Sequence, residues 1–200
     1  SSRYPILAER TRVELDIKRS RFVGTVAPVE TVDDAKAFVA EIKAEFPDAN
    51  HNCWAYLVGA PGRTDQVGLS DDGEPHGTAG RPMLDILVHS NVGDIAAVVT
   101  RYFGGTKLGR GGLVRAYGDS VQAALEAAPR SERVAWHVAR VTIDYAGVES
   151  FKRMLPAHEA TIVEEHWTER AAFDVRLPEP GLEAFRDAVR ELSNGTARVE

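Results

Sequence analysis

The sequence predicts a two-domain α+β protein, with the boundary between residues 130 and 131. Helix-like and strand-like patterns follow one another along all 200 residues, so both kinds of element are expected in each part of the chain. A polar link that contains Pro129 interrupts these patterns at the boundary. Most of the glycine lies between Gly59 and Gly118, which further separates the first part of the chain from the second.

The first domain, residues 1–130, is expected to be a mixed β/α domain in which helices cover a sheet. Thr31 and Asp34 have the spacing of a helix capping box. Ile95–Phe103 is the most apolar strand-like run and is therefore expected at the centre of the sheet. The expected elements are a hairpin of Thr11–Ile17 and Arg21–Val26, a helix from Thr31 to Pro47, a strand Asn52–Val58, a loop Gly59–Gly80, a short helix at Pro82, a strand Ile95–Phe103 and a helix Leu113–Ala128.

The second domain, residues 131–200, has the order βαββαβ, which is typical of a ferredoxin-like antiparallel sheet with two helices on one face. Apolar residues at helical spacing and the terminators Pro156 and Asn194-Gly195 delimit the helices. The expected elements are a strand Val134–Tyr145, a helix from Val148 to Leu155, a hairpin of Thr161–Thr168 and Ala171–Leu177, a helix from Leu182 to Leu192 and a strand Thr196–Glu200.

The composition excludes several classes of protein. A net charge of −6 and a pI near 5.6 argue against a protein that coats nucleic acid through its overall charge, so no DNA partner is predicted. One cysteine, Cys53, allows neither an internal disulfide nor a four-cysteine zinc site. No run of eighteen apolar residues and no signal-peptide pattern is present, which predicts a cytoplasmic protein without membrane contact.

The most distinctive segment is RYFGGTKLGRGGL, Arg101–Leu113, which lies between a predicted strand and a predicted helix. Backbone N–H groups at such a helix start, together with the helix dipole, favour an anion. Glycine allows the backbone to approach a ligand closely, and arginine suits phosphate or carboxylate. We expect an anion- or RNA-binding site formed by Arg101, Tyr102, Gly104, Gly105, Lys107, Gly109, Arg110, Gly111, Gly112 and Arg115.

The known phosphate motifs do not match this segment. Lys107 lacks the flanking residues of a Walker A motif, and Val114 stands where the dinucleotide-binding fingerprint needs its third glycine. An ordinary NTPase or Rossmann enzyme is therefore not expected. The alternative remains that the glycines only build a tight turn and pack a helix onto the sheet.

A second segment, SDDGEPHGTAG at Ser70–Gly80, brings Asp71, Glu74 and His76 close together in sequence. Its spacing matches neither an EF-hand loop nor a zinc hydrolase, and turn formation accounts for Asp-Gly and Glu-Pro, so no metal site is expected. We expect these three residues to act as accessory groups. In this interpretation the acidic loop meets Arg101 or Lys107 through surface ion pairs and orders the cationic loop.

His51 and Cys53 are two apart on a predicted strand and share a face, which raises the possibility of a Cys-His nucleophile. A lone cysteine in an apolar strand is more often a small buried residue. No GxSxG motif or other nucleophile elbow is present, so no catalytic residue and no cofactor is expected.

Four segments of this sequence resemble the IMPACT family in its bacterial two-domain form: Ser20–Gly24, His51–Tyr56, Ser70–Leu84 and Val98–Gly118. The resemblance implies a first domain similar to domain IV of elongation factor G. It also implies a ferredoxin-like second domain similar to domain V of that factor. Eukaryotic members of the family act in translational control by binding an activator of an initiation-factor kinase, a partner absent from bacteria.

Three functions remain in view. The first is a translation-associated binding protein that contacts the ribosome or RNA through the glycine-rich loop, with the turn at Lys18, Arg19 and Arg21 as a further basic segment. The second is a regulator that binds a translation-related protein without RNA contact. The third is an enzyme acting on a phosphorylated small molecule, with Asp71, Glu74 or His76 as acid–base groups. We favour a binding protein over an enzyme.

Overall fold

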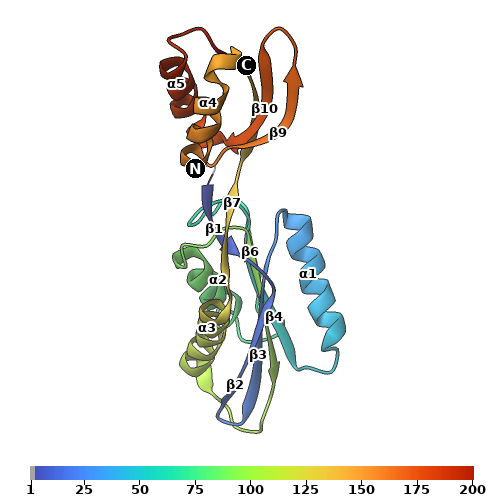
Figure 1. Cartoon of the computed structure of the whole chain (residues 1–200). Helices are drawn as coiled ribbons and strands as arrows, with labels where there is room; N and C mark the ends of the chain where they lie inside the picture. Colours follow the sequence, from blue (N-terminus) through green and yellow to red (C-terminus); the bar gives the residue numbers. More distant parts are fainter. Residues whose placement is uncertain (1–2) are drawn as a thin grey trace. The chain divides into compact units, whose positions relative to one another are not determined.

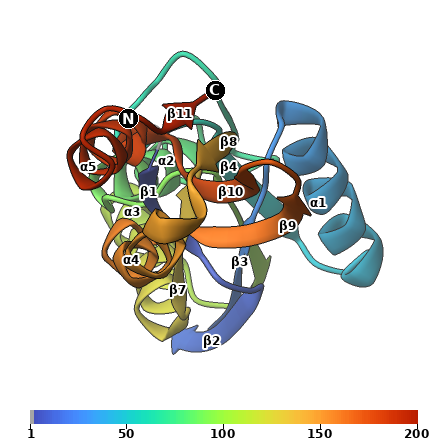
Figure 2. The same cartoon turned by 45° about the horizontal axis from the view of Figure 1, so that its top comes forward.

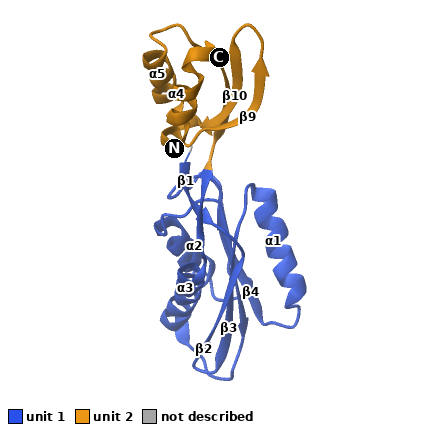
Figure 3. Cartoon of the chain, in the orientation of Figure 1, with its two compact units in different colours: residues 1, 3–133 blue, residues 2, 134–200 orange. Residues whose placement is uncertain are grey.

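The computed structural model describes residues 3–200, which form two compact units, Arg3–Arg133 and Val134–Glu200 (Figures 1 and 3). The division therefore falls close to the residue 130/131 boundary expected from the sequence. Each unit has its own buried core. None of the helices in residues 3–200 has the length and apolar character needed to cross a bilayer.

A five-stranded sheet, antiparallel throughout, organises the first unit. Strand β6 lies at its centre, as its apolar sequence predicts, and is buried from Ile95 to Arg101. In spatial order the strands are β2 (Thr11–Ile17), β3 (Ser20–Pro28), β6 (Ile95–Tyr102), β4 (His51–Leu57) and β5 (Val67–Ser70).

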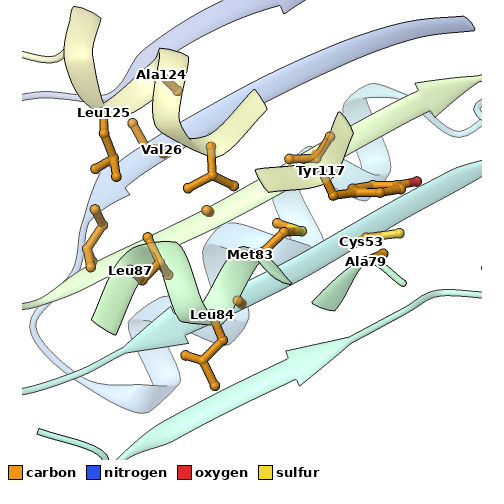
Figure 4. Close-up of a cluster of buried hydrophobic side chains, with 14 of the residues drawn as sticks. Val26, Cys53, Ala79, Met83, Leu84, Leu87, Tyr117, Ala124 and Leu125 are labelled. Carbon is orange, nitrogen blue, oxygen red and sulfur yellow. The ribbon is translucent and has the colours of Figure 1, made fainter. Parts of the chain in front are cut away.

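Helices cover both faces of this sheet (Figure 1). Helix α1, Val32–Glu45, packs on one face, and its capping box is confirmed by the Asp34 amide, which donates to Thr31 Oγ1 over 3.0 Å. Helices α2, Gly80–His89, and α3, Gly109–Ala127, pack on the other face. Figure 4 shows side chains of α2 and α3 meeting those of the strands in the larger core.

Three strands of this unit have no counterpart among the sequence predictions. Strands β1, Arg3–Leu7, and β7, Arg130–Val134, form a separate two-stranded sheet. Strand β5 lies inside the segment predicted as a loop, because it is a four-residue edge strand with little apolar alternation. Its Gly68 leaves room for the ring of Tyr56, which an added Cβ would overlap.

Helix α3 also begins four residues earlier than predicted, at Gly109 instead of Leu113. Gly109 has a φ of +74°, a conformation that glycine adopts without strain and that lets the chain enter the helix sharply. Gly111 and Gly112 therefore belong to the first turn of the helix, not to the loop before it.

The second unit has the predicted βαββαβ order. Its sheet is antiparallel with the strand order β11-β8-β10-β9, and α4 and α5 lie on the same side of the sheet (Figure 2). The elements are β8 (Trp136–Ile143), α4 (Val148–Met154), β9 (Thr161–Trp167), β10 (Ala171–Pro178), α5 (Leu182–Leu192) and β11 (Arg198–Val199), with short 3-10 turns at Tyr145–Gly147, Leu155–His158 and Glu179–Gly181. In its core the ring of Phe151 contacts the rings of Phe173 and Phe185.

Replacing Gly104 should destabilise the first unit, because an added Cβ would overlap the carbonyl oxygen of Arg19. We expect Gly104→Ala to lower the free energy of unfolding by about 3 kcal/mol, the cost of overpacking a rigid site. Gly111→Ala is the matched control, since its added Cβ would meet no atom within 4 Å. That variant should be about 0.5–1 kcal/mol more stable than wild type, because alanine favours a helix over glycine. Urea denaturation measures both, and equal stability of the two variants would refute the close approach at Gly104.

Candidate anion-binding site

The glycine-rich loop presents backbone donors that nothing else in the described chain uses. Only the Phe103 amide is occupied, donating to Asn50 Oδ1 over 2.8 Å. Within residues 3–200 the amides of residues 104–108 donate to no acceptor. The first amides of α3, from Gly109 onward, have no partner inside a helix by geometry and no capping side chain. The backbone is therefore available to an anion at this position.

The basic turn between β2 and β3 lies directly against this loop. Gly104 approaches the carbonyl of Arg19 closely, and the strand pair Arg21 and Tyr102 holds the two segments at one end of the sheet. Lys18 and Arg19 have φ values of +47° and +69° and are exposed.

Helix α3 adds a third basic position to the same region. Lys18 and Arg115 line one groove of about 180 Å³, together with Gly112 and the acidic Asp119. Two basic segments that are about 85 positions apart in the sequence thus form one cationic end of the sheet, which we define as Lys18, Arg19, Lys107, Arg110 and Arg115.

Arg101, which the sequence predicts both to bind an anion and to meet the acidic loop, is buried and paired. The residue is only 6% exposed, and its Nη1 donates to Glu74 Oε1 over 2.6 Å. Its Nε and Nη2 lie 3.4 and 3.3 Å from Ser20 Oγ. The charge of Arg101 is therefore compensated inside the protein, although the residue still borders the pocket described below.

Glu74 is the partner that the acidic loop supplies. It is 7% exposed, and the same Oε1 atom accepts a hydrogen bond from Tyr117 Oη over 2.9 Å and lies 3.5 Å from His51 Nε2. The expected contact between the acidic loop and Arg101 is thus present. The expectation of a surface pair is wrong, because both side chains are buried, and breaking a buried pair costs far more than breaking a surface pair.

The other acidic-loop residues have structural roles. Asp71 accepts hydrogen bonds from the amides of Gly77, Ala79 and Gly80 and so caps the start of α2. Burial alone raises the pKa of Asp71, but these three backbone donors outweigh it and hold the pKa below its ordinary value. The His76 side chain is exposed to solvent, with its Nδ1 3.9 Å from Asp71 Oδ2, and its carbonyl accepts from Arg110 Nη2 over 2.7 Å.

A pocket of about 480 Å³ joins the acidic and glycine-rich loops. Of the residues expected to bind an anion, Arg101, Lys107, Gly109 and Arg110 line it, and of the accessory residues only Glu74 does. Tyr102 does not, because its hydroxyl donates to Asp48 and its ring lies under Arg21. The remaining lining residues are Asn50, His51, Pro75, Phe103, Leu108 and Leu113.

Asn50 is the lining residue that sequence reasoning missed. It follows α1 in a turn, where asparagine usually has only a local role, so no pattern marks its contact with the Phe103 amide. The sequence predicts Leu113 at the start of a helix, and only the folded chain shows that Leu113 and Leu108 also form pocket walls.

Cys53 is not suited to nucleophilic catalysis. Its thiol is fully buried and donates to the carbonyl of Asp71 over 3.0 Å. Burial raises the pKa of the thiol far above its ordinary value, so the thiolate is absent at neutral pH. His51 does not activate it, since its Nδ1 is hydrogen-bonded to the Asp72 carbonyl at 2.8 Å.

One group of possible metal ligands occurs among the described residues, in the second unit: Glu164, His166 and Asp174. Arg140 donates to both carboxylate oxygens of Asp174, over 2.8 and 2.9 Å, and its Nη2 lies 3.2 Å from His166 Nε2. A guanidinium therefore already occupies the centre of this group, and its charge opposes a metal cation.

The fold and the site define a two-domain α+β protein with a pocket at one end of the first sheet that is lined by basic, acidic and apolar residues. A family model described as the Impact N-terminal domain matches residues 18–125, and a model of a domain of unknown function (DUF1949) matches residues 141–196. The chain belongs to the IMPACT family.

Its relatives match over both units. It is 41% identical to an IMPACT family member of Haemophilus influenzae over 94% of this chain and 91% of the relative. It is 39% identical to the IMPACT family member YigZ of Escherichia coli over 92% and 90%, respectively. A solved structure titled as that of a hypothetical protein covers 100% of this chain and 97% of its own, with 37% identity and a TM-score of 0.68.

Eukaryotic relatives match less of the chain. Protein IMPACT of Rattus norvegicus is 33% identical over 46% of this chain and 29% of its own length. The likeness to domains of elongation factor G stays a prediction.

Removing the Glu74 side chain should destabilise the protein, because the buried charge of Arg101 would lose its partner. We expect Glu74→Ala to lower the free energy of unfolding by about 3–5 kcal/mol, because Arg101 would stay buried without its partner. The double variant Glu74→Ala/Arg101→Met should recover part of this loss, since it removes both charges and keeps an apolar side chain. Urea titrations of wild type and the variants test this, and a double variant less stable than Glu74→Ala would contradict it.

The native protein should not react with a thiol reagent at neutral pH. Cys53 is buried, and its raised pKa keeps the thiol protonated, so Ellman's reagent should label no cysteine in the folded chain. In urea the same sample should titrate one thiol per chain. Rapid labelling without urea would show that Cys53 is accessible as a thiolate.

Proposed function

We propose that this IMPACT family protein is a non-enzymatic, translation-associated binding protein that contacts RNA or the ribosome through the cationic end of its first sheet. The observation that carries the proposal is the convergence of the Lys18-Arg19 turn with the glycine-rich loop. The link to translation rests on the family resemblance. The contact with RNA rests on the chemistry of the cationic end.

This local charge suits a phosphate backbone. The whole chain carries a net charge of −6, so an RNA contact must be confined to a basic patch. Lys18, Arg19, Lys107 and Arg115 form no ion pair within residues 3–200. Unpaired cations and open backbone amides lose little when phosphate replaces water, whereas a cation such as Arg101 would first have to leave Glu74.

The site offers less support for an enzyme. Asp71 already accepts hydrogen bonds from backbone amides at the start of α2. The side chain of His76 is exposed to solvent, and Cys53 is buried. Of the three accessory residues only Glu74 lies in the pocket, and two donors already engage one of its oxygens. His51 also lines the pocket, but its Nε2 lies 3.5 Å from that same oxygen and its Nδ1 is hydrogen-bonded to the Asp72 carbonyl, so both groups already have partners inside the protein.

The double variant Lys107→Ala/Arg110→Ala should weaken binding to ribosomes and to RNA. Each lost phosphate contact removes counterion release, so the slope of log Kd against log salt concentration should fall by about 2. The measurement is a binding titration at several salt concentrations, and circular dichroism checks the fold of each variant.

Lys36→Ala/Arg186→Ala is the matched control, because it removes two exposed cations outside the cationic end. It should leave affinity and salt slope near those of wild type. If both double variants changed affinity and salt slope equally, the cationic end would not be the binding site and the proposal would be wrong. Capture of a protein that survives ribonuclease treatment and depends on Lys107 would instead favour the protein-binding regulator.

A further inference from the structure

The 480 Å³ pocket is larger and more apolar than a site for phosphate alone needs to be. Its walls combine Lys107 and Arg110 with four apolar residues, and its floor holds a buried carboxylate, Glu74. A phosphate contact needs only donors and positive charge, whereas pockets of this size commonly hold a small organic group. The apolar residues that line it are Pro75, Phe103, Leu108 and Leu113.

Phe103 is placed as a stacking platform at this pocket. The residue is 48% exposed, although large apolar side chains are usually buried. Its amide is fixed by Asn50, and the guanidinium of Arg101 lies 5.5 Å from the ring centroid. The ring is thus held in place while nearly half of the residue stays accessible, and aromatic rings in such positions stack with bases in RNA-binding proteins.

Lys107 and Arg110 supply the charge beside that ring. Lys107 has no ion-pair or hydrogen-bond partner within residues 3–200. Arg110 uses Nη2 to hold the His76 carbonyl, which positions its guanidinium and leaves its remaining N–H donors for a ligand. A phosphate group attached to a stacked ring would find both contacts in the same pocket.

Glu74 determines which chemical groups of a ligand can lie at the floor of this pocket. Its Oε1 accepts from Arg101 and Tyr117, whereas Oε2 accepts no hydrogen bond within the described chain. A carboxylate oxygen accepts hydrogen bonds and repels a second anion. The floor therefore favours a neutral N–H or O–H donor, such as a ribose hydroxyl or the amino group of a base.

We propose that this pocket binds a single unpaired nucleotide. Its base stacks on Phe103, its phosphate contacts Lys107 and Arg110, and its sugar or base donates toward Glu74. A free nucleoside monophosphate and an unpaired nucleotide of RNA share this chemistry. The proposal builds on the RNA contact proposed above, since it assigns the pocket at the cationic end to one nucleotide.

The experiment compares ligands that differ only in the presence of an unpaired nucleotide. The RNA probes are a blunt-ended hairpin and the same hairpin with a short unpaired 3′ overhang, measured by fluorescence anisotropy at constant salt. The small probes are the four nucleoside monophosphates, ribose 5-phosphate and inorganic phosphate, measured by calorimetry. The proteins are wild type, Phe103→Ala, Phe103→Trp and the control Trp136→Ala, which removes an exposed aromatic side chain from the second unit.

Wild type should bind the overhang RNA about tenfold more tightly than the blunt RNA, the effect of one stacked base. Phe103→Ala should abolish this preference with little change for blunt RNA, and Phe103→Trp should keep it. Trp136→Ala should behave as wild type does. Equal affinity of wild type for both hairpins, together with no preference for monophosphates over inorganic phosphate, would overturn the nucleotide assignment.

The two proposals fail in different ways. RNA binding that depends on Lys107 and Arg110 but not on Phe103 would overturn the nucleotide pocket and retain the proposed function. Binding of a monophosphate that depends on Phe103, without binding of either hairpin, would retain the pocket and overturn the RNA contact.

Discussion

The buried ion pair between Glu74 and Arg101 is the interaction on which the site depends. Glu74 comes from the loop after β5 and Arg101 from the end of β6, and Tyr117 of α3 and His51 of β4 approach the same carboxylate oxygen. One carboxylate thus links two strands, a loop and a helix. Because a charge left alone in this position would be costly, the acidic loop is held where it closes one side of the pocket.

The division of charges follows from this arrangement. The buried cation Arg101 pairs with the buried anion Glu74, whereas the exposed cations Lys18, Arg19 and Lys107 form no ion pair within residues 3–200. The neighbouring carboxylate Asp71 is also neutralised locally, by backbone amides. An acidic protein can therefore present a local positive surface, although the exposed Asp119 lines the same groove as Lys18 and Arg115.

The sequence was most informative where a local rule decides the structure. The Thr31 capping box, the central position of β6 and the βαββαβ order of the second unit all follow from spacing or apolar runs. Strands β1 and β7 escaped prediction because each depends on a partner strand far away in the chain, and β5 because it is a four-residue strand at the edge of the sheet. Their own residues have too little alternation to mark them.

The candidate site was predictable only where local residue types mark it. Glycine and basic residues identified the loop, and opposite charges suggested that the acidic loop meets it. Which carboxylate does so, and whether the contact is buried, depends on side chains from β4 and α3 that surround Glu74. No sequence pattern carries that information, and none indicates that Asn50 holds the Phe103 amide.

The hairpin between β2 and β3 has a wider consequence. Its two central residues both adopt positive φ, a geometry in which Asn-Gly is ordinarily preferred, yet Lys18 and Arg19 occupy it. Neither side chain forms a hydrogen bond or ion pair within residues 3–200 that would offset the conformational cost. Folding alone would select a different pair of residues at this turn. Backbone strain of this kind is concentrated at functional sites, and at this turn it holds two basic side chains at the cationic end.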